Sequence, residues 1–412
     1  MTKRLEYILS GTSYTRIHAV IDDPVVKPII DKLMALPGKM TNHKFGLLYN
    51  AFSEAGFGPN LRKIPNIDSI HADSGGLQII TQGLTATDEI KKKIFKNQAT
   101  YADLGMCFDE IPVTTVGTTS GRNDTSNRFF DKDNLKALAT QTGKNIESQI
   151  DVFLDEKSKC KPILIAQGNC YETYMEWVDT ILAAIPKEKH KYIGGVAMGG
   201  AALGTGSLED IERAFIYSQL QIEKTHLHVL GVGSIKRMLP YVTFMKNGLY
   251  EDASVSYDST THSSGIELGC YFKNGSMNTY SRSFNKVYHM MYADAMALHN
   301  ANISPEKYFK LLNSSKTKWV EAGEDLPTFY AVRLSSIIAA VINFCQYLDN
   351  IVANESAFLD FVGSDKSLTP FLSLVDVKSL SDYNRWKASV GRYVKTNRIA
   401  AQQPASLEGF FS

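Results

Sequence analysis

The chain has 412 residues, of which 44% are hydrophobic and 21% charged, a composition that excludes a disordered or fibrous protein. Its 44 basic and 43 acidic residues give a net charge of +1, so any contact with nucleic acid must come from a local patch. Five scattered cysteines and an N terminus without a long apolar run favour a cytoplasmic protein. The best apolar run, Ser335 to Phe344, is shorter than the ~20 residues that cross a bilayer, so no membrane role is indicated.

Short apolar runs alternate with amphipathic segments along the first 260 or so residues, a pattern typical of strand-helix units around a parallel sheet. The eight runs are Glu6 to Ser10, Lys44 to Tyr49, Asp68 to Ala72, Asp103 to Phe108, Pro162 to Ala166, Tyr192 to Ala197, Leu227 to Leu230 and Ala253 to Tyr257. Eight such units predict an α/β fold, a (β/α)8 TIM barrel. The first two strands could instead form a hairpin across the bottom of the barrel.

Polar residues and glycines come directly after the later strands, at Asp73, Asp109, Gln167, Gly199, Gly231 and Asp258. Because the carboxyl ends of barrel strands share one open face, these residues are expected to meet in one site. For any single position, an ordinary turn or helix cap explains the residue equally well.

Two longer regions complete the chain. The stretch from Val113 to Asp131 has no periodicity, and we interpret it as a lid or binding loop whose Arg122 and Arg128 could meet phosphates. From about Asn285 the pattern is helical. We therefore divide the chain into a barrel domain, residues 1–284, and a helical C-terminal region, residues 285–412.

Six short motifs follow one another in order between Asp68 and Tyr271. They are Asp73-Ser74-Gly75-Gly76-Leu77-Gln78, Phe108-Asp109-Glu110, Ala166-Gln167-Gly168, Gly194-Gly195-Val196-Ala197-Met198-Gly199, Leu230-Gly231-Val232-Gly233 and Tyr257-Asp258-Ser259. In this order and spacing they resemble the tRNA-guanine transglycosylase family, (β/α)8 enzymes that exchange a guanine in a polynucleotide for a 7-deazaguanine.

The resemblance implies that Asp258 is the nucleophile and Asp73 the acid/base residue. A carboxylate beside the anomeric carbon can stabilise an oxocarbenium-like state and then capture it as a covalent glycosyl-enzyme. A second carboxyl group with a raised pKa can protonate the departing base and deprotonate the incoming one. The alternative for Asp258 is a strand-end cap.

The same resemblance implies a base-binding set. Asp109 can accept both the N1-H and the 2-amino group of guanine, while Gln167 and the backbone N-H of Gly195 serve the 6-oxo group. Leu77 and Leu230 are expected to sandwich the ring. Ser74 and Gly194 complete the predicted base-binding residues.

No metal or other cofactor is expected. The tRNA enzymes carry a C-x-C-x-x-C zinc cluster after the nucleophile strand, whereas this chain has only Cys270 and Cys345 in that region. His226 and His228 could place two imidazoles on one face of a strand, and we interpret them as barrel-packing residues.

The missing zinc motif makes the chain most similar to the phage and bacterial DNA 7-deazaguanine transglycosylases, so we expect DNA as the polymer, with tRNA as the alternative. The second partner is the free 7-deazaguanine base, such as 7-cyano-7-deazaguanine; a homodimer is allowed. Two further readings stay open, a non-catalytic nucleic-acid-binding subunit and a barrel hydrolase acting on a free nucleoside.

One segment near the C terminus has the composition of a nucleic-acid contact. It carries Arg385, Lys387, Arg392, Lys395 and Arg398, with Tyr383, Trp386 and Tyr393 between them and no acidic residue. Basic side chains attract phosphates, and aromatic rings can stack on exposed bases. The alternative is an amphipathic helix that packs its rings on the barrel.

Overall fold

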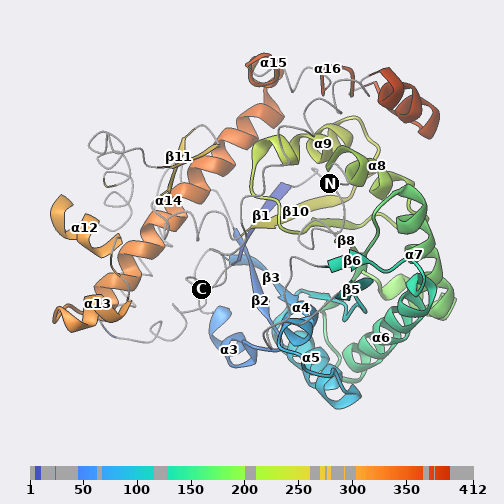
Figure 1. Ribbon diagram of the computed structural model, residues 1–412, viewed down its shortest axis with the longest axis horizontal. Helices are drawn as coiled ribbons and strands as arrows, with labels where there is room; N and C mark the ends of the chain where they lie inside the picture. The colour runs from blue at the N-terminus through green and yellow to red at the C-terminus, as the bar shows by residue number, and fades with distance from the viewer. Residues whose placement is uncertain are drawn as a thin grey trace.

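The computed structural model describes residues 5–10, 24, 45–62, 67–115, 128–199, 210–259, 270–273, 276–279, 292, 303–312, 314, 316–364, 371–374 and 376–389. Eight parallel strands close into a barrel in the order β1-β10-β9-β8-β7-β4-β3-β2 (Figure 1). They are β1 Leu5–Leu9, β2 Phe45–Asn50, β3 Ile67–Asp73, β4 Leu104–Met106, β7 Lys161–Ala166, β8 Gly195–Met198, β9 His226–Val229 and β10 Ser254–Ser259. Each corresponds to one of the eight apolar runs, so the predicted (β/α)8 barrel is confirmed.

The first two strands are full members of the barrel. β1 pairs in parallel with β10 on one side and with β2 on the other. The alternative of an N-terminal hairpin across the barrel bottom is therefore wrong. The physical reason is that Tyr7, Ile8 and Leu9 of β1 and Leu47 and Tyr49 of β2 point to both faces of their strands and are buried, as in strands covered on both sides.

Helices surround the barrel in the expected alternation (Figure 1). They are η2 Ala55–Phe57, α3 Gly58–Leu61, α4 Gly76–Thr81, α5 Asp88–Tyr101, α6 Leu135–Asp155, α7 Tyr171–Ala184, η4 Lys187–Tyr192, α8 Asp210–Gln219 and α9 Ile235–Lys246. Helix α7 shows why they pack: Tyr174, Trp177, Val178 and Ile181 recur at helical spacing and are fully buried. The Trp177 indole also donates a hydrogen bond to the Ile165 carbonyl of β7.

The stretch interpreted as a lid or binding loop, Val113 to Asp131, has a short β-strand near each of its ends. β5 (Val113–Thr115) pairs antiparallel with β6 (Arg128–Phe130). The ends of the predicted loop are thus a two-stranded ribbon beside the barrel. Residues 116–127, including Arg122, lie outside the described part of the chain.

The described part of the C-terminal region is helical, as predicted. Its elements are α12 Pro305–Leu312, α13 Lys316–Glu321, α14 Leu326–Ala353, α15 Glu355–Gly363, α16 Phe371–Leu374 and a last helical stretch at residues 380–389. Before it, between β10 and residue 285, β11 (Cys270–Lys273) pairs antiparallel with β12 (Ser276–Thr279). Asp325 caps α14 by accepting the backbone N–H of Thr328.

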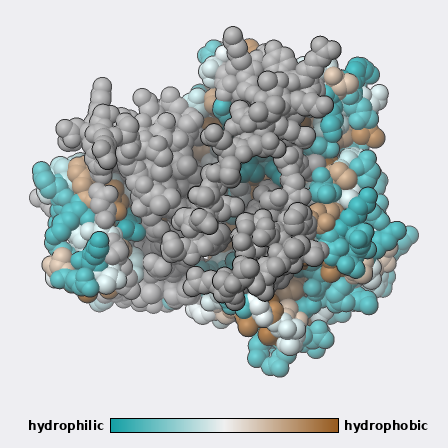
Figure 2. All heavy atoms as spheres, in the orientation of Figure 1, coloured by the Kyte–Doolittle hydropathy of each residue, from teal (hydrophilic) through white to brown (hydrophobic). Residues whose placement is uncertain are grey.

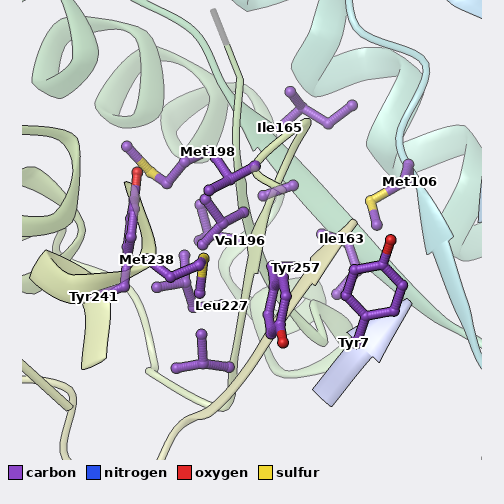
Figure 3. Packing of buried hydrophobic residues seen from close by; sticks show 14 of the residues in the cluster. Tyr7, Met106, Ile163, Ile165, Val196, Met198, Leu227, Met238, Tyr241 and Tyr257 are labelled. Carbon is purple, nitrogen blue, oxygen red and sulfur yellow. The ribbon is translucent and has the colours of Figure 1, made fainter. Parts of the chain in front are cut away.

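Helix α14 covers the outer face of β1 and β10. Tyr7 and Tyr257, which lie side by side in Figure 3, have ring centroids 5.2 Å apart. Phe344 of α14 packs against both rings, at 6.1 and 5.9 Å.

By length and composition α14 could cross a membrane, but 77% of its most apolar window is buried in the protein, as in a core helix. On the face shown in Figure 2, the hydrophobic side chains of the described helices are scattered among hydrophilic ones.

Candidate active site

Asp73 is the last residue of β3 and lies partly buried at the carboxyl end of the barrel. Its pKa is raised to about 6, mainly by desolvation and also by the charge of Asp258, while hydrogen bonds from the backbone N–H groups of Gly75 and Ser74 oppose the shift. The Asn50 side-chain amide lies 3.5 Å from Oδ2. A carboxyl group in this environment can hold or release a proton near neutral pH.

The turn after Asp73 depends on Gly75. Its φ of +75° is left-handed, and a Cβ there would lie 2.6 Å from Cβ of Phe52. Ser74 is buried, and its Oγ accepts the N–H of Gly76, where α4 begins. The Asp-Ser-Gly-Gly sequence therefore turns the chain sharply enough to aim backbone N–H groups at the Asp73 carboxylate.

Asp109 and Gln167 form a direct pair across neighbouring strands. Each follows its strand, β4 or β7, and Gln167 Nε2 donates to Asp109 Oδ2 over 2.8 Å. The pKa of Asp109 is raised to about 7, mainly by burial and also by the charge of Asp73. The hydrogen bond from Gln167 opposes this shift. Because an amide NH2 carries two hydrogens, the second can still meet a ligand oxygen.

Asp258, on β10, is held by three hydrogen bonds. His228 Nε2 lies 3.2 Å and the Gly231 backbone N 3.1 Å from Oδ1, while Ser10 Oγ donates to Oδ2 over 3.2 Å. The Asp258 side chain is 10% exposed. Donors fixed by the backbone and by barrel strands hold its carboxylate in one orientation.

The three acids act on one another. The charge of Asp258 raises the pKa of Asp73, and the charge of Asp73 raises that of Asp109. They come from β10, from β3 and from the segment after β4, and all lie at the carboxyl ends of the strands. The structure thus brings together Asp73, Asp109, Gln167 and Asp258 as predicted.

Gly194 and Gly195 lie at the amino end of β8, and their predicted base-binding role stays a prediction. Gly194 N–H bonds to the Pro162 carbonyl, and a Cβ there would lie 2.5 Å from Cβ of Lys161 on β7. A Cβ at Gly195 would lie 2.3 Å from the His226 carbonyl oxygen, so this glycine allows β8 to approach β9 closely.

Gly199 follows β8 and lies beside the side-chain amide of Gln167. Its carbonyl accepts the Tyr174 hydroxyl over 2.7 Å, and a Cβ at Gly199 would lie 2.8 Å from atoms of the Gln167 amide. Any other residue at this position would therefore displace Gln167. The sequence analysis places Gly199 directly after the apolar run of its strand.

The two leucines predicted to sandwich a base lie on different walls. Leu77 is on α4, just after β3, and Leu230 directly follows β9. Because β3 and β9 are four strands apart in an eight-stranded barrel, the two residues approach the site from opposite sides. This placement is compatible with a sandwich, which stays a prediction.

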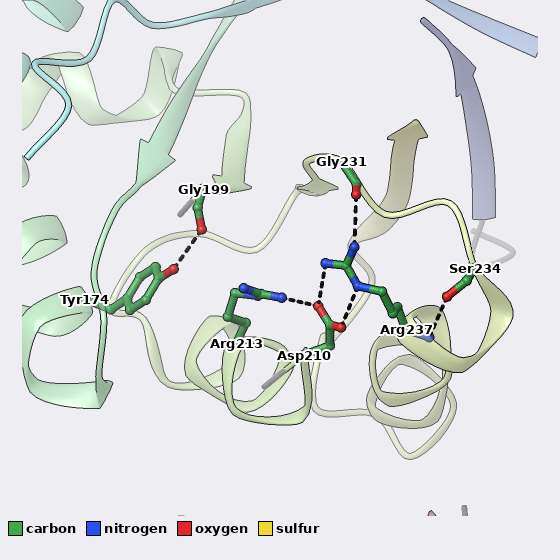
Figure 4. Close-up of polar contacts among 7 residues, drawn as sticks. All are labelled: Tyr174, Gly199, Asp210, Arg213, Gly231, Ser234 and Arg237. Carbon is green, nitrogen blue, oxygen red and sulfur yellow. Dashed lines mark hydrogen bonds and ion pairs between the residues drawn. The ribbon is translucent and has the colours of Figure 1, made fainter. Parts of the chain in front are cut away.

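Three residues contact Asp258 directly: Gly231, which the sequence analysis expected in the site, and Ser10 and His228, which it did not place there. Gly231 is in turn held by Arg237 of α9, whose NH1 donates to the Gly231 carbonyl over 3.2 Å (Figure 4). Arg237 also bonds Asp210 through Nε at 2.8 Å, and Asp210 pairs with Arg213. This arginine cluster (Asp210, Arg213 and Arg237) therefore fixes the loop that donates to Asp258.

Among the described residues, one group has the proximity that a metal ion needs. Ring nitrogens of His71, His226 and His228 lie within 4.8 Å of one another inside the barrel. Both nitrogens of His226 bond serine hydroxyls at 2.7 Å, and those of His228 bond Ser256 and Asp258. These hydrogen bonds use the lone pairs or protons that metal binding would require, so the packing interpretation of the histidines fits better.

The C-terminal basic segment packs its aromatic rings on the barrel. Tyr383 stacks on Phe215 of α8 with centroids 4.1 Å apart, and Trp386 is buried beside it. The alternative of an amphipathic helix is thus confirmed for these two rings. Lys387 pairs with Glu212 and Arg385 with Asp382, while Arg392, Lys395 and Arg398 lie outside the described residues.

No protein-family model matches the sequence, and no curated protein matches it. The resemblance to the transglycosylases therefore rests on the sequence motifs alone.

Proposed function

We propose that this protein is a transglycosylase that replaces guanine in a polynucleotide, with DNA as the first candidate, by a 7-deazaguanine. The observation that carries the proposal is the contrast between Asp73 and Asp258. The two carboxyl groups lie at one end of the barrel, yet desolvation raises the pKa of Asp73 to about 6, whereas Asp258 is held by three hydrogen-bond donors. Two acids with different environments are the requirement for acid/base and nucleophilic roles.

In the proposed reaction, Asp258 attacks the anomeric carbon while the bond from that carbon to guanine breaks. The bonding electrons leave with the base, and Asp73 in its protonated form supplies the proton. The product is a glycosyl ester of Asp258 and free guanine. Asp73 then removes a proton from the incoming 7-deazaguanine, whose nitrogen displaces Asp258 and restores the original configuration.

Base selection falls to Asp109 and Gln167. An ionised Asp109 accepts the two adjacent donors on guanine or a 7-deazaguanine, and the second N–H of Gln167 meets the 6-oxo group. Adenine lacks this donor pair and would leave a buried carboxylate unpaired. Such a mismatch costs on the order of a few kcal/mol, enough to exclude the wrong base.

The test is exchange of labelled guanine into DNA and into tRNA, combined with trapping of a covalent adduct. We expect the wild type to exchange with DNA, and Asp258→Asn to form at least about 10³-fold less adduct, since it removes the nucleophile. Asp252→Asn, an exposed change six residues earlier on the same segment, is the matched control and should behave as wild type.

Each other outcome selects a different function. Exchange with tRNA only would make the protein a tRNA enzyme. Binding of polynucleotide without exchange, unchanged in Asp258→Asn, would make it a non-catalytic binding subunit. Turnover of a free nucleoside without polymer would make it a hydrolase.

A further inference from the structure

A chain of hydrogen bonds runs through the barrel interior to Asp258. Ser254 Oγ lies 2.7 Å from His226 Nδ1, and His226 Nε2 lies 2.7 Å from Ser256 Oγ. Ser256 Oγ then lies 2.8 Å from His228 Nδ1, and His228 Nε2 reaches Asp258 Oδ1 at 3.2 Å. These five residues, the histidine-serine chain, alternate between β9 and β10.

Strand register builds this chain. Ser254 pairs with His226 and Ser256 with His228 in the parallel β9–β10 ladder. Because side chains alternate along a strand, Ser254, Ser256 and Asp258 share one face of β10 and the two histidines share one face of β9. His71 of β3 packs on both imidazoles, with ring centroids 5.6 and 5.5 Å away, and holds the rings in place.

With Asp258 ionised and both rings neutral, the donors can be assigned in only one way. An ionised carboxylate only accepts, so His228 Nε2 must carry the proton, and Nδ1 must accept from the Ser256 hydroxyl. Ser256 Oγ then accepts from His226 Nε2–H, and His226 Nδ1 accepts from Ser254. Every bond in the chain has one donor, all directed toward Asp258.

We propose that His228 is a positioning residue for Asp258, fixed in its Nε2–H form by Ser256 and His226, and that the carboxylate oxygen facing Ser10 is the one that attacks. Among the described residues, Oδ1 receives two donors, His228 Nε2–H and Gly231 N–H, whereas Oδ2 receives one, the Ser10 hydroxyl. When Oδ2 bonds the anomeric carbon, Oδ1 becomes the ester carbonyl oxygen. When that bond breaks, its electron pair returns to the carboxylate, and the two donors stabilise it as the leaving group.

This inference deepens the proposed function, since the attack by Oδ2 depends on it, but the state of the rings can be measured without any reaction. In ¹⁵N NMR of the histidine-labelled wild type, we expect protonated Nε2 and unprotonated Nδ1 for both His226 and His228. Ser256→Ala should leave His228 as a mixture of the two tautomers. A wild-type His228 without a proton on Nε2 would overturn the proposal.

Kinetics separate positioning from a merely structural role. His228→Phe keeps a ring against His71 but removes the donor, and should slow adduct formation at saturating oligonucleotide by on the order of 10²-fold, with oligonucleotide affinity nearly unchanged. His228→Gln, which restores an N–H donor, should recover roughly tenfold of that loss. Equal losses in the two variants, or loss of affinity without loss of rate, would contradict the proposal.

Two further outcomes are decisive. A structure of the trapped adduct should show the sugar on the oxygen that faces Ser10, and attachment to Oδ1 would overturn the assignment. A stoichiometric metal in the purified protein, lost in both His71→Ala and His226→Ala, would mean that the rings bind metal instead. If the wild type formed no adduct with DNA or tRNA while His228 kept its Nε2 proton, the proposed function would fail and the histidine-serine chain would stand.

Discussion

Two groups of charged residues lie near the carboxyl end of the barrel, and they are balanced in opposite ways. In the arginine cluster, Asp210 pairs with Arg213 and Arg237, so the buried negative charge is compensated twice (Figure 4). In the acid cluster (Asp73, Asp109 and Asp258), the hydrogen-bond partners among the described residues are hydroxyl, amide, imidazole and backbone N–H groups. The charge of Asp258 raises the pKa of Asp73, and the charge of Asp73 raises that of Asp109. Carboxylates paired with arginines stabilise a fold. Carboxylates held close to one another repel, and a bound ligand that donates hydrogen bonds to them can offset that repulsion.

Removing the carboxylate of the compensated cluster should have the largest effect on stability. Asp210→Asn leaves Arg213, whose side chain is 6% exposed, without its ion pair, and we expect a loss of about 3 kcal/mol in the free energy of unfolding. Urea denaturation measures it. Glu89→Gln, which breaks an exposed pair with Lys93, is the control and should leave the free energy of unfolding nearly unchanged. Equal effects of the two changes would remove the distinction between the clusters.

Replacing a carboxylate by an amide in the acid cluster should stabilise the protein instead of destabilising it. The pKa of Asp73 is raised from 3.8 to about 6, so the unfolded chain releases this proton at a lower pH than the folded one, and stability falls as pH rises from about 4 to about 6. Asp73→Asn should therefore raise the free energy of unfolding by roughly 2 kcal/mol at pH 8 and change it little near pH 3. If the difference in stability between Asp73→Asn and the wild type did not vary with pH, the folded protein would not raise the pKa of Asp73.

The placement of the acids could be predicted from the sequence because each follows a strand whose apolar run is easily recognised. Asp73, Asp109 and Asp258 are polar residues at the point where burial ends. The positions of the glycines relative to their strand were harder to predict. Gly194-Gly195 and Gly199-Gly200 flank the same apolar run, and glycine has no side chain whose polarity marks an end of the strand. The pairing of Gly195 with Ile163 shows that Gly195 lies at the amino end of β8.

The contacts of Asp258 depended on strand register, which no local pattern contains. Ser10 lies 248 residues away in the chain and meets Asp258 only because β1 closes the barrel against β10. The histidines on β9 were recognised as a pair on one face, but their order of donation depends on the serines of the neighbouring strand. For Tyr383 and Trp386, spacing indicated an amphipathic helix and could not say whether its rings meet protein or nucleic acid.

The acid cluster should also make base binding depend on pH. The base needs an ionised Asp109, and burial raises the pKa of this residue to about 7. We expect the affinity for 7-cyano-7-deazaguanine to rise about tenfold per pH unit below pH 7 and to level off above it, since one proton competes with the base. Asp109→Asn should lower affinity by on the order of 10²-fold and abolish this dependence. Asp73→Asn is the control that removes the other acid titrating nearby; if it too abolished the dependence, the assignment to Asp109 would be wrong.

The smallest effect is expected for the exposed basic side chains near the C terminus, when their contribution to DNA binding is removed. Arg385 and Lys387 have side chains 77% and 54% exposed, on a helix whose Tyr383 and Trp386 are already packed, so only their charges remain for a polynucleotide. Arg385→Gln and Lys387→Gln should each weaken DNA binding a few-fold and reduce the slope of log affinity against log salt by about one. Lys93→Gln, an exposed lysine on α5, should leave the slope unchanged. If all three variants bind like the wild type at every salt concentration, the segment is a packing helix, and the contact with the strand must come from residues nearer the acid cluster.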